Sequence, residues 1–326
     1  MPKPKVFATH SLFEPARQIL QENCEVEYWA KPGRPPREEV LRRVKDKEGL
    51  ICLLTEKINE ELLSVAPKLR IAANVAVGFD NIDVAACTKR GVAATNTPGV
   101  LDETTADFAW TLLMAVARRL SEGEALARSG NWKNWDLDQL VGTDVWGKTL
   151  GIVGFGRIGR AVARRASGFQ MKVIYTDAVR AAEEVEKELK AEFREMNALL
   201  GESDFISVHV PLLPETRRLF DAPKFRRMKP TAFLINTSRG PVVDEAALAA
   251  ALEGGHIAGA GLDVYENEPL IHPGLKRANV VLAPHIASAS LETRTKMACI
   301  AAKNVVAVFT GQRPPNILNP EVLKTT

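Results

Sequence analysis

The segment Thr149–Arg160 reads TLGIVGFGRIGR, and it decides the fold of the chain. It places the pattern G-x-G-x-x-G directly after an apolar, β-favouring run and directly before a helical one. Gly154 lets the chain turn tightly off the strand, Gly156 lets the backbone approach a pyrophosphate, and Gly159 lets helix pack close to strand. The N-terminus of the helix then faces the phosphates. The segment therefore predicts a dinucleotide-binding βαβ unit.

An acidic residue at the expected distance supports this interpretation. Asp177 lies 23 residues after Gly154, at the end of a second strand-like run, Lys172–Thr176. A carboxylate at this place accepts hydrogen bonds from the adenine-side ribose hydroxyls and repels a 2′-phosphate, so we expect NAD(H) to be preferred. Arg180 is close enough in sequence to receive that phosphate if Asp177 turns away, which leaves NADP(H) open. The glycine triplet alone would be explained equally well by a structural turn, but strand, helix and spaced Asp together favour a dinucleotide site.

The composition is that of an ordinary soluble globular protein. Hydrophobic residues make up 46% and charged residues 25% of the 326 positions, and the net charge of +3 is too small to imply nucleic acid or an anionic membrane as the main partner. No apolar stretch approaches the ~18 residues of a membrane span. The four cysteines, which show no C-x-x-C pairing, are expected to be reduced packing residues of a cytoplasmic protein; they are Cys24, Cys52, Cys87 and Cys299. We expect no metal site.

The glycine motif comes late, because about 145 residues precede it and a dinucleotide domain usually opens with its first strand. The opening segment alternates short apolar runs with helix-like stretches, which predicts a small parallel sheet flanked by helices in a flavodoxin-like substrate domain. The apolar runs are Lys5–Ala8, Gly49–Leu54 and Leu69–Ala73, and the helical stretches include Glu38–Lys45 and Asn59–Ala66. A turn-forming cluster, Asn96–Gly99, then leads into one long predicted helix, Asp102–Leu120, as the connection between domains.

The alternation resumes after the glycine motif and predicts a doubly wound sheet of about six parallel strands. The later strand candidates are Phe205–Val208, Ala232–Asn236, Gly259–Leu262 and Val280–Ala283, with the helical stretch Asp244–Glu253 among them. An amphipathic helix at Leu291–Thr310 follows the completed sheet and is expected to return to the first domain. The expected fold class is α/β with two parallel doubly wound sheets. A Rossmann dinucleotide domain, 100–288, is inserted into a substrate domain formed by 1–99 and 289–326.

Three polar residues follow strands of the predicted sheet and carry the candidate chemistry: Arg239, Glu268 and His285. Ligands of open parallel sheets bind outside the carboxyl ends of the strands, so these residues can converge beside a nicotinamide. Reduction of a 2-oxoacid needs a cation for the carboxylate and carbonyl oxygen, a proton donor, and a group that tunes the donor. Arg239 could instead be a turn residue, and His285 a capping or core residue. The residues alone do not choose between Glu266 and Glu268.

The separated motifs resemble the D-isomer-specific 2-hydroxyacid dehydrogenase family over nearly the whole chain. The motifs are GFGRIG at 154–159, NTSRG at 236–240, GLDV at 261–264 with Glu268-Pro269, and PHIA at 284–287. The resemblance implies that Arg239 binds the substrate carboxylate and carbonyl, that His285 is the general acid/base, and that Glu268 hydrogen-bonds His285. Glu266 is then a loop residue.

The same resemblance implies roles for further residues. Segment 74–83, NVAVGFDNID, is similar to the substrate loop of the family, with the amides of Val77 and Gly78 on the carboxylate; family members often carry Gly where Ala76 stands. Thr105 resembles a Thr near the nicotinamide, and Pro211 matches the adenine pocket. Asp263 would contact the carboxamide. Cofactor contacts are also implied for Arg157, Ile158 and Thr237.

Within the family, segments 49–55 and 132–135 are most similar to glyoxylate/hydroxypyruvate reductases. There a partner-subunit Trp lines the pocket, which implies a homodimer with Trp135 as the candidate; packing inside the dimer explains this Trp equally well. The chain stops at Thr326, without the regulatory domain of long-form phosphoglycerate dehydrogenases, and formate dehydrogenases carry Gln where Glu268 stands.

The sequence thus predicts an NAD(P)H-dependent reductase of a small 2-oxoacid, with glyoxylate or hydroxypyruvate favoured, that forms the D-2-hydroxyacid. The alternatives are another D-2-hydroxyacid dehydrogenase, such as a 2-ketogluconate reductase or a phosphoglycerate dehydrogenase, and a redox-sensing NAD-binding regulatory protein. The chain lacks the long disordered flanks typical of such regulators, and a turnover assay separates the two classes.

Overall fold

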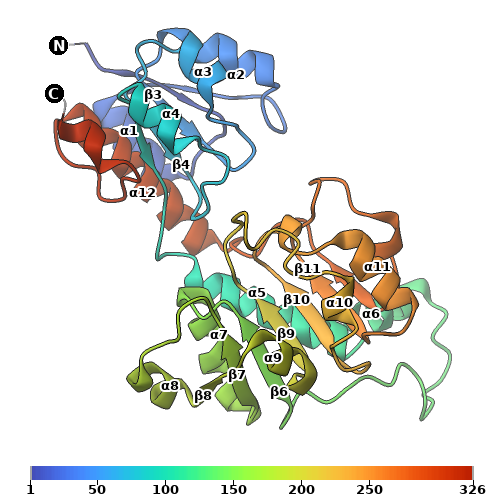
Figure 1. Cartoon of the computed structure of the whole chain (residues 1–326). Coiled ribbons are helices and arrows are strands. Elements are labelled where there is room, and N and C mark those ends of the chain that lie inside the picture. Colours follow the sequence, from blue (N-terminus) through green and yellow to red (C-terminus); the bar gives the residue numbers. More distant parts are fainter. Residues whose placement is uncertain (1, 325–326) are drawn as a thin grey trace. The chain divides into compact units, whose positions relative to one another are not determined.

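The computed structural model describes residues 2–324, which form two compact units (Figure 1). The central unit comprises 102–288, and the discontinuous unit comprises 1–101 together with 289–326. The first boundary follows Leu101, two residues after the expected position.

The central unit contains a parallel sheet of seven strands in the order β12-β11-β10-β9-β6-β7-β8. Counted from β6, this is the Rossmann order 3-2-1-4-5-6 with one further strand. We expected about six strands, and the missed one is β8, an edge strand of three residues with a charged residue at its centre. The strands are β6 (Thr149–Val153), β7 (Lys172–Thr176), β8 (Ala191–Phe193), β9 (Phe205–Val208), β10 (Phe233–Asn236), β11 (Gly259–Leu262) and β12 (Val280–Leu282).

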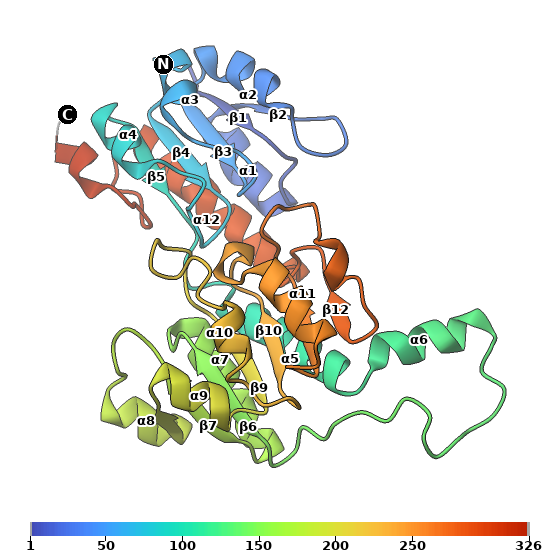
Figure 2. The same ribbon diagram turned by 45° about the vertical axis from the view of Figure 1, so that its right-hand side comes forward.

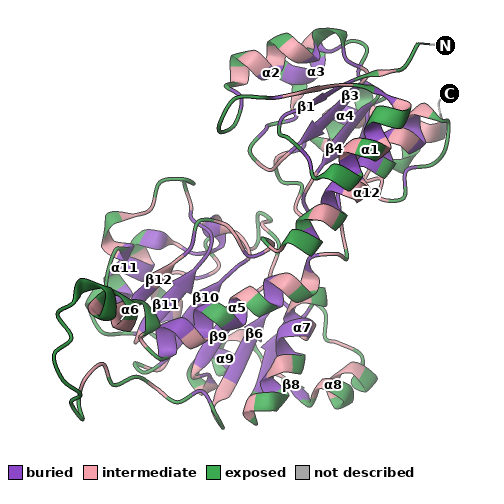
Figure 3. Cartoon of the chain, turned by 180° about the vertical axis from the view of Figure 1, so that it is seen from behind, coloured by how far each residue is buried: buried purple, intermediate pink, exposed green. Residues whose placement is uncertain are grey.

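Helices cover both faces of this sheet because its central strands are apolar on both sides. Leu150, Ile152 and Ile235 pack with α5 and α7 in one core, whereas Val153, Ile206 and Leu234 pack with α9, α10 and α11 in another. Figure 3 shows the strands as almost wholly buried. The helices are α5 (Asp102–Ala117), α6 (Leu120–Ser129), α7 (Arg157–Ala166), α8 (Glu183–Leu189), α9 (Met196–Glu202), α10 (Ala222–Phe225) and α11 (Glu245–Glu253).

The predicted helix Asp102–Leu120 is wrong in two respects. It ends at Ala117, since Arg119 adopts a left-handed conformation with φ of 53°, and a separate α6 begins at Leu120. It is also part of the central unit, because seven of its buried residues pack with the sheet and α7 in one core. Figure 2 shows α6 and the segment 130–147 running away from that sheet; we call 120–147 the arm.

The discontinuous unit contains a five-stranded parallel sheet in the order β2-β1-β3-β4-β5, which is the flavodoxin-like order. The sequence analysis missed β2 and β5, the two edge strands, because β2 (EVEY) alternates charged and apolar residues and β5 has only three residues. The strands are β1 (Lys5–Ala8), β2 (Glu25–Tyr28), β3 (Gly49–Cys52), β4 (Ile71–Asn74) and β5 (Ala93–Thr95). One face packs on α1 and α12 and the other on α2, α3 and α4. These helices are α1 (Glu14–Asn23), α2 (Arg37–Arg43), α3 (Glu60–Val65), α4 (Val84–Lys89) and α12 (Leu291–Phe309).

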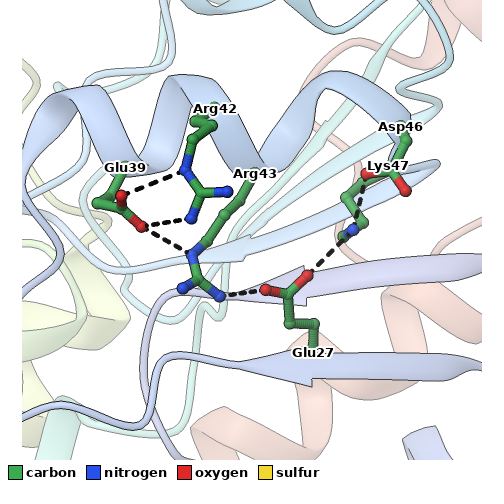
Figure 4. Close-up of polar contacts among 6 residues, drawn as sticks. All are labelled: Glu27, Glu39, Arg42, Arg43, Asp46 and Lys47. Carbon is green, nitrogen blue, oxygen red and sulfur yellow. Dashed lines mark hydrogen bonds and ion pairs between the residues drawn. The ribbon is translucent and has the colours of Figure 1, made fainter.

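An ion-pair network ties β2 to α2 and the 3-10 turn Val44–Asp46 (Figure 4). Glu27 pairs with Arg43 and, at 3.0 Å, with Lys47. Glu39 accepts hydrogen bonds from Arg42 and Arg43, which lower the pKa of its carboxyl to about 2. Most of its side chains are at least partly exposed, so the network contributes little to stability.

The described residues contain no helix that is both long and apolar enough to cross a membrane. All four cysteines are free thiols, and Cys24, Cys52 and Cys87 are buried. Burial raises the pKa of Cys24 to about 11 and that of Cys87 to about 12, so these thiols are unreactive packing residues near neutral pH.

Candidate functional site

The structure gives a different reason for glycine at each of the three motif positions in the β6–α7 turn. Gly154 has φ of 95°, and a Cβ there would lie 2.7–2.8 Å from the backbone of His209 and Val210 after β9. A Cβ on Gly159 would overlap the carbonyl oxygen of Gly154. Gly156, in contrast, would meet nothing within 4 Å. Gly154 and Gly159 are therefore required by the fold, whereas the space in front of Gly156 is open for a ligand.

The neighbouring residues of α7 play unequal parts. Arg157 is largely exposed, and its Nε lies 3.0 Å from the Asp102 carboxylate at the start of α5. Ile158 is half-buried. Gly156 is the residue before α7. The backbone N–H groups at the N-terminus of α7 therefore lie directly beside the open space.

Asp177 follows β7, and its Oδ2 accepts a hydrogen bond of 2.5 Å from the backbone N–H of Phe155, so it lies against the glycine turn. Arg180 is held by Glu186, which accepts two hydrogen bonds of 2.9 Å from its guanidinium. The same carboxylate accepts a bond of 2.6 Å from the Tyr175 hydroxyl. Arg180 is therefore already engaged with an acid.

Three other residues expected near a cofactor lie in the central unit. Thr105 is buried in α5, and Pro211 is exposed in the loop after β9. Thr237 follows β10 and is 8% exposed, and its hydroxyl oxygen is buried without a hydrogen-bond partner. An unpartnered buried hydroxyl and an open glycine, both at the carboxyl ends of parallel strands, fit the polar contacts that a dinucleotide requires.

His285 and Glu268 form a direct pair. The Nδ1 atom of His285 lies 2.8 Å from Oε2 of Glu268, and each side chain is about one-third exposed. Burial acts to raise the pKa of the Glu268 carboxyl, but the hydrogen bond and charge of His285, with the nearby Arg239 charge, hold it below its usual range. The Glu268 carboxylate thus stays ionised at neutral pH, and the Nε2 side of the imidazole is left for a reactant.

Glu266 faces elsewhere. Its carboxylate lies 3.5 Å from Nε of Arg218, and its backbone N–H donates a hydrogen bond of 2.7 Å to the buried Glu245. Of the two acids that the sequence left open, Glu268 is the one that contacts His285.

Arg239 follows β10 in a turn that the side chain of Asn236 stabilises by hydrogen bonds. Asn236 is 1% exposed; its amide donates to the Arg239 carbonyl at 3.1 Å and its oxygen accepts from Ser238. The half-buried Arg239 donates from Nη1 to the Ser238 carbonyl at 2.8 Å. Its charge acts on Glu268, so the cation, the acid and the imidazole lie in one region of the central unit.

Asp263 lies directly after β11 and is fully buried. It is 0% exposed, and its two carboxylate oxygens each accept a 2.8 Å hydrogen bond, one from the N–H of Ile286 and one from Ala287. Its carbonyl accepts the N–H of His285 at 2.9 Å. Burial raises the pKa of this carboxyl, against the two backbone hydrogen bonds. In this structure Asp263 therefore holds the turn that carries His285, whose φ is 56°.

The substrate loop expected from the resemblance lies after β4 in the discontinuous unit. The carbonyls of Ala76, Val77 and Gly78 are all bound inside this unit. They accept from the N–H of Thr97 at 2.8 Å, the Asn96 amide at 2.7 Å and the Asn74 amide at 2.9 Å, respectively. A trans peptide points its N–H opposite its carbonyl, so the N–H groups of Val77 and Gly78 are directed away from these partners. Within residues 2–324 neither N–H donates a hydrogen bond.

The roles of Asn74 and Asn96 were missed by the sequence analysis. Both are buried amides directly after apolar runs, which is the signal that could have found them, since a buried amide must be hydrogen-bonded. Trp135 lies in the arm and is 74% exposed. The described residues contain no cluster of His, Cys, Asp and Glu that could hold a metal ion.

Comparison with known proteins identifies the family of this chain. Residues 110–287 match the family described as "D-isomer specific 2-hydroxyacid dehydrogenase, NAD binding domain". The chain is 53% identical to a glyoxylate reductase of Korarchaeum cryptofilum, over 99% of this chain and 98% of that one. It is 51% identical to the glyoxylate reductase of Thermococcus kodakarensis over 99% and 98% of the two chains.

Solved structures of similar proteins cover the whole fold. A glyoxylate reductase from Paecilomyes thermophila has a TM-score of 0.86 and 31% identity, over 98% of this chain and 100% of that one. An NADPH-dependent glyoxylate/hydroxypyruvate reductase from Sinorhizobium meliloti, in complex with NADP and malonate, has a TM-score of 0.85 and 33% identity, over 98% and 97% of the chains.

The fold and the comparisons define an NAD(P)-dependent oxidoreductase with a Rossmann domain. The chain belongs to the D-isomer-specific 2-hydroxyacid dehydrogenase family. NAD(P)H-dependent reduction of a 2-oxoacid is the activity of this class of enzyme.

Proposed function

We propose that this enzyme reduces glyoxylate, and also hydroxypyruvate, to the corresponding 2-hydroxyacid, with the D configuration where the product is chiral. The observation that carries the proposal is the pair formed by His285 and ionised Glu268, in the region reached by the charge of Arg239. Two relatives of about 50% identity over the full chain bear the name glyoxylate reductase, which supports the substrate.

The proposed chemistry uses the three residues in separate roles. A bound nicotinamide supplies a hydride for the keto carbon. Arg239 binds the substrate carboxylate and polarises the keto oxygen, and His285 donates the proton that this oxygen takes as the hydride arrives. Glu268 favours the imidazolium form of His285 before transfer. Glyoxylate, NADH and one proton thus give glycolate and NAD⁺.

Further groups are assigned to substrate and cofactor. We propose that the undonated N–H groups of Val77 and Gly78 bind the substrate carboxylate, so that the discontinuous unit is the substrate domain and the central unit is the dinucleotide domain. Gly154, Gly156, Gly159, Arg157 and Ile158 would form the pyrophosphate turn, and Asp177 would bind the adenine-side ribose. Thr105, Thr237, Pro211 and Asp263 are proposed to complete the cofactor site.

The test of function is a steady-state panel on the purified full chain. Glyoxylate, hydroxypyruvate, pyruvate, 2-ketogluconate and 3-phosphohydroxypyruvate are compared with NADH and NADPH. We expect the highest kcat/KM for glyoxylate or hydroxypyruvate, and a loss of about 10²-fold or more in His285→Asn. Preferred turnover of the phosphorylated acid, or a fully active His285→Asn, would contradict the proposal. A folded, NADH-binding protein without any turnover would point to a regulatory protein.

We propose that the enzyme is a homodimer in which the arm contacts a second copy. Six large apolar residues of the arm are more than half exposed: Leu120, Trp132, Trp135, Leu137, Val141 and Trp146. Such a patch is unusual on a monomer and indicates an interface. Light scattering after gel filtration should give twice the chain mass, and Leu137→Asp should shift the enzyme toward monomers. Trp135→Ser separates the two roles of this Trp, because a pocket residue changes KM while a packing residue changes the dimer population.

We further propose a cytoplasmic location, which the free cysteines support because reduced thiols are typical of that compartment. Cell fractionation with an antibody to the chain tests it.

A further inference from the structure

Tyr265 lies between the segments that carry the three proposed catalytic residues. It follows β11, is 4% exposed, and donates a hydrogen bond of 2.8 Å from its hydroxyl to the carbonyl of Ala283. The hydroxyl also lies 3.3 Å from the Leu262 carbonyl. Ala283 comes two residues before His285, so this bond fixes the end of β12 from which the imidazole projects.

The backbone of the same residue holds the acid. The N–H of Tyr265 donates to Oε1 of Glu268 at 3.1 Å, while Oε2 of Glu268 pairs with His285 at 2.8 Å. Because both carboxylate oxygens are bound, the plane of the carboxylate is set and presents one oxygen to the imidazole.

The loop of Arg239 packs against the next peptide, which joins Tyr265 to Glu266. A Cβ on Gly240 would overlap the carbonyl group of Tyr265, so Gly240 allows the two backbones to approach this closely. Segments that follow β10, β11 and β12 therefore meet at one residue.

We propose that Tyr265 is a positioning residue for this reaction: its hydroxyl and peptide together set His285, Glu268 and the Arg239 loop in register. The inference rests on the proposed function, because it assumes that these three residues act on the substrate. Phenylalanine would fill the same space but could not hold the Ala283 carbonyl.

The Tyr265 hydroxyl keeps its proton near neutral pH, as a hydrogen-bond donor must. Burial, with the neighbouring charges of Asp263 and Glu268, raises the pKa of Tyr265 to about 12. The hydroxyl therefore remains a neutral donor near neutral pH.

The test is Tyr265→Phe in the full-length enzyme, with Tyr28→Phe as the matched control. Tyr28 lies in the discontinuous unit, where its ring and hydroxyl interact with Arg17 of the same unit. In Tyr265→Phe we expect kcat for glyoxylate reduction to fall by about tenfold, the scale of one lost hydrogen bond, with KM for NADH unchanged. The alkaline limb of the pH–rate profile should move to lower pH, because Glu268 then favours the imidazolium less. Tyr28→Phe should match the wild type in all three measurements.

A purely structural role would lower the melting temperature and leave the kinetics of the folded enzyme unchanged, which would overturn the inference. If Tyr265→Phe does not fold on its own, it is refolded and assayed with saturating NADH, since a ligand that binds only the folded chain stabilises it. We expect the same fall in kcat and the same shift of the limb, and an unshifted limb in this variant overturns the inference.

Glu268→Gln distinguishes failure of the proposed catalytic pair from failure of the positioning role of Tyr265. If it leaves the limb in place, the proposed catalytic pair is wrong. If it moves the limb and Tyr265→Phe does not, the positioning role alone fails.

Discussion

Oε2 of Glu268 lies 2.8 Å from Nδ1 of His285, whereas the carboxylate of Glu266, two residues earlier, lies 3.5 Å from Arg218. Both acids are glutamates of the same loop. They differ in where their side chains point, since Glu268 faces His285 and Glu266 faces Arg218. Substitution of each glutamate in turn therefore tests which of them acts on His285.

Glu268→Gln should shift the pH dependence of both reaction directions. The pKa of Glu268 is lowered, so its carboxylate is ionised throughout the neutral range and favours the imidazolium. Reduction needs imidazolium and falls as pH rises, while oxidation needs neutral imidazole and falls as pH drops. Without the carboxylate, the fall in reduction and the acid limb of oxidation should both move to lower pH. The measurement is kcat/KM against pH for glyoxylate reduction and glycolate oxidation.

The control is Glu266→Gln, which should leave both limbs in place because Glu266 pairs with Arg218. The reverse pattern would make Glu266 the functional partner, and two unshifted profiles would remove the pair from the mechanism.

Arg239→Lys should lower kcat/KM much more than the conserved positive charge suggests. An ammonium cannot reproduce the two-pronged grip of a guanidinium on carboxylate and carbonyl. We expect a loss of about 2–4 kcal/mol in kcat/KM for glyoxylate, on the scale of one preorganised donor. Arg218→Lys is the matched control, because that exposed residue should tolerate the change. Near-normal kinetics in a folded Arg239→Lys enzyme would exclude Arg239 from the site.

Two alanine substitutions in the glycine turn should separate fold from ligand binding. Gly156→Ala meets no protein atom within 4 Å, so we expect an unchanged melting temperature and a Kd for NADH about tenfold weaker or more, or about 1.4 kcal/mol. Gly159→Ala forces a methyl against the Gly154 carbonyl and should destabilise the protein by about 1–3 kcal/mol. Gly168→Ala, also in open space, should change neither quantity. Calorimetry measures both, and unaltered NADH affinity in Gly156→Ala would place the pyrophosphate elsewhere.

NADH should be preferred over NADPH. Asp177 repels a 2′-phosphate, and Arg180, which could receive one, is engaged by Glu186 in two hydrogen bonds of 2.9 Å. Glu186→Gln, which weakens that engagement, should raise kcat/KM for NADPH relative to NADH. A wild-type preference for NADPH of tenfold or more would contradict the assignment.

The sequence by itself determined the Rossmann domain, since the glycine spacing, the apolar strands and Asp177 are local patterns. Arg239 and His285 were also within its reach, because residues that follow parallel strands gather at one edge of the sheet. The edge strands β2, β5 and β8 and the break at Arg119 were not, since a strand of three or four residues at a sheet edge forms only beside its neighbour and a left-handed Arg carries no distinctive pattern.

Only the tertiary structure decided what the polar residues touch. Loop acids such as Glu266 and Glu268 have no periodicity, so their directions depend on contacts of the folded chain. The N–H of Tyr265 donates to Glu268, and the buried Glu245 accepts from the N–H of Glu266. The undonated N–H groups of the substrate loop likewise depend on Asn96, which is distant in sequence. A hydrogen bond needs a donor and an acceptor at a set distance and angle, and only the folded chain brings such separated groups together.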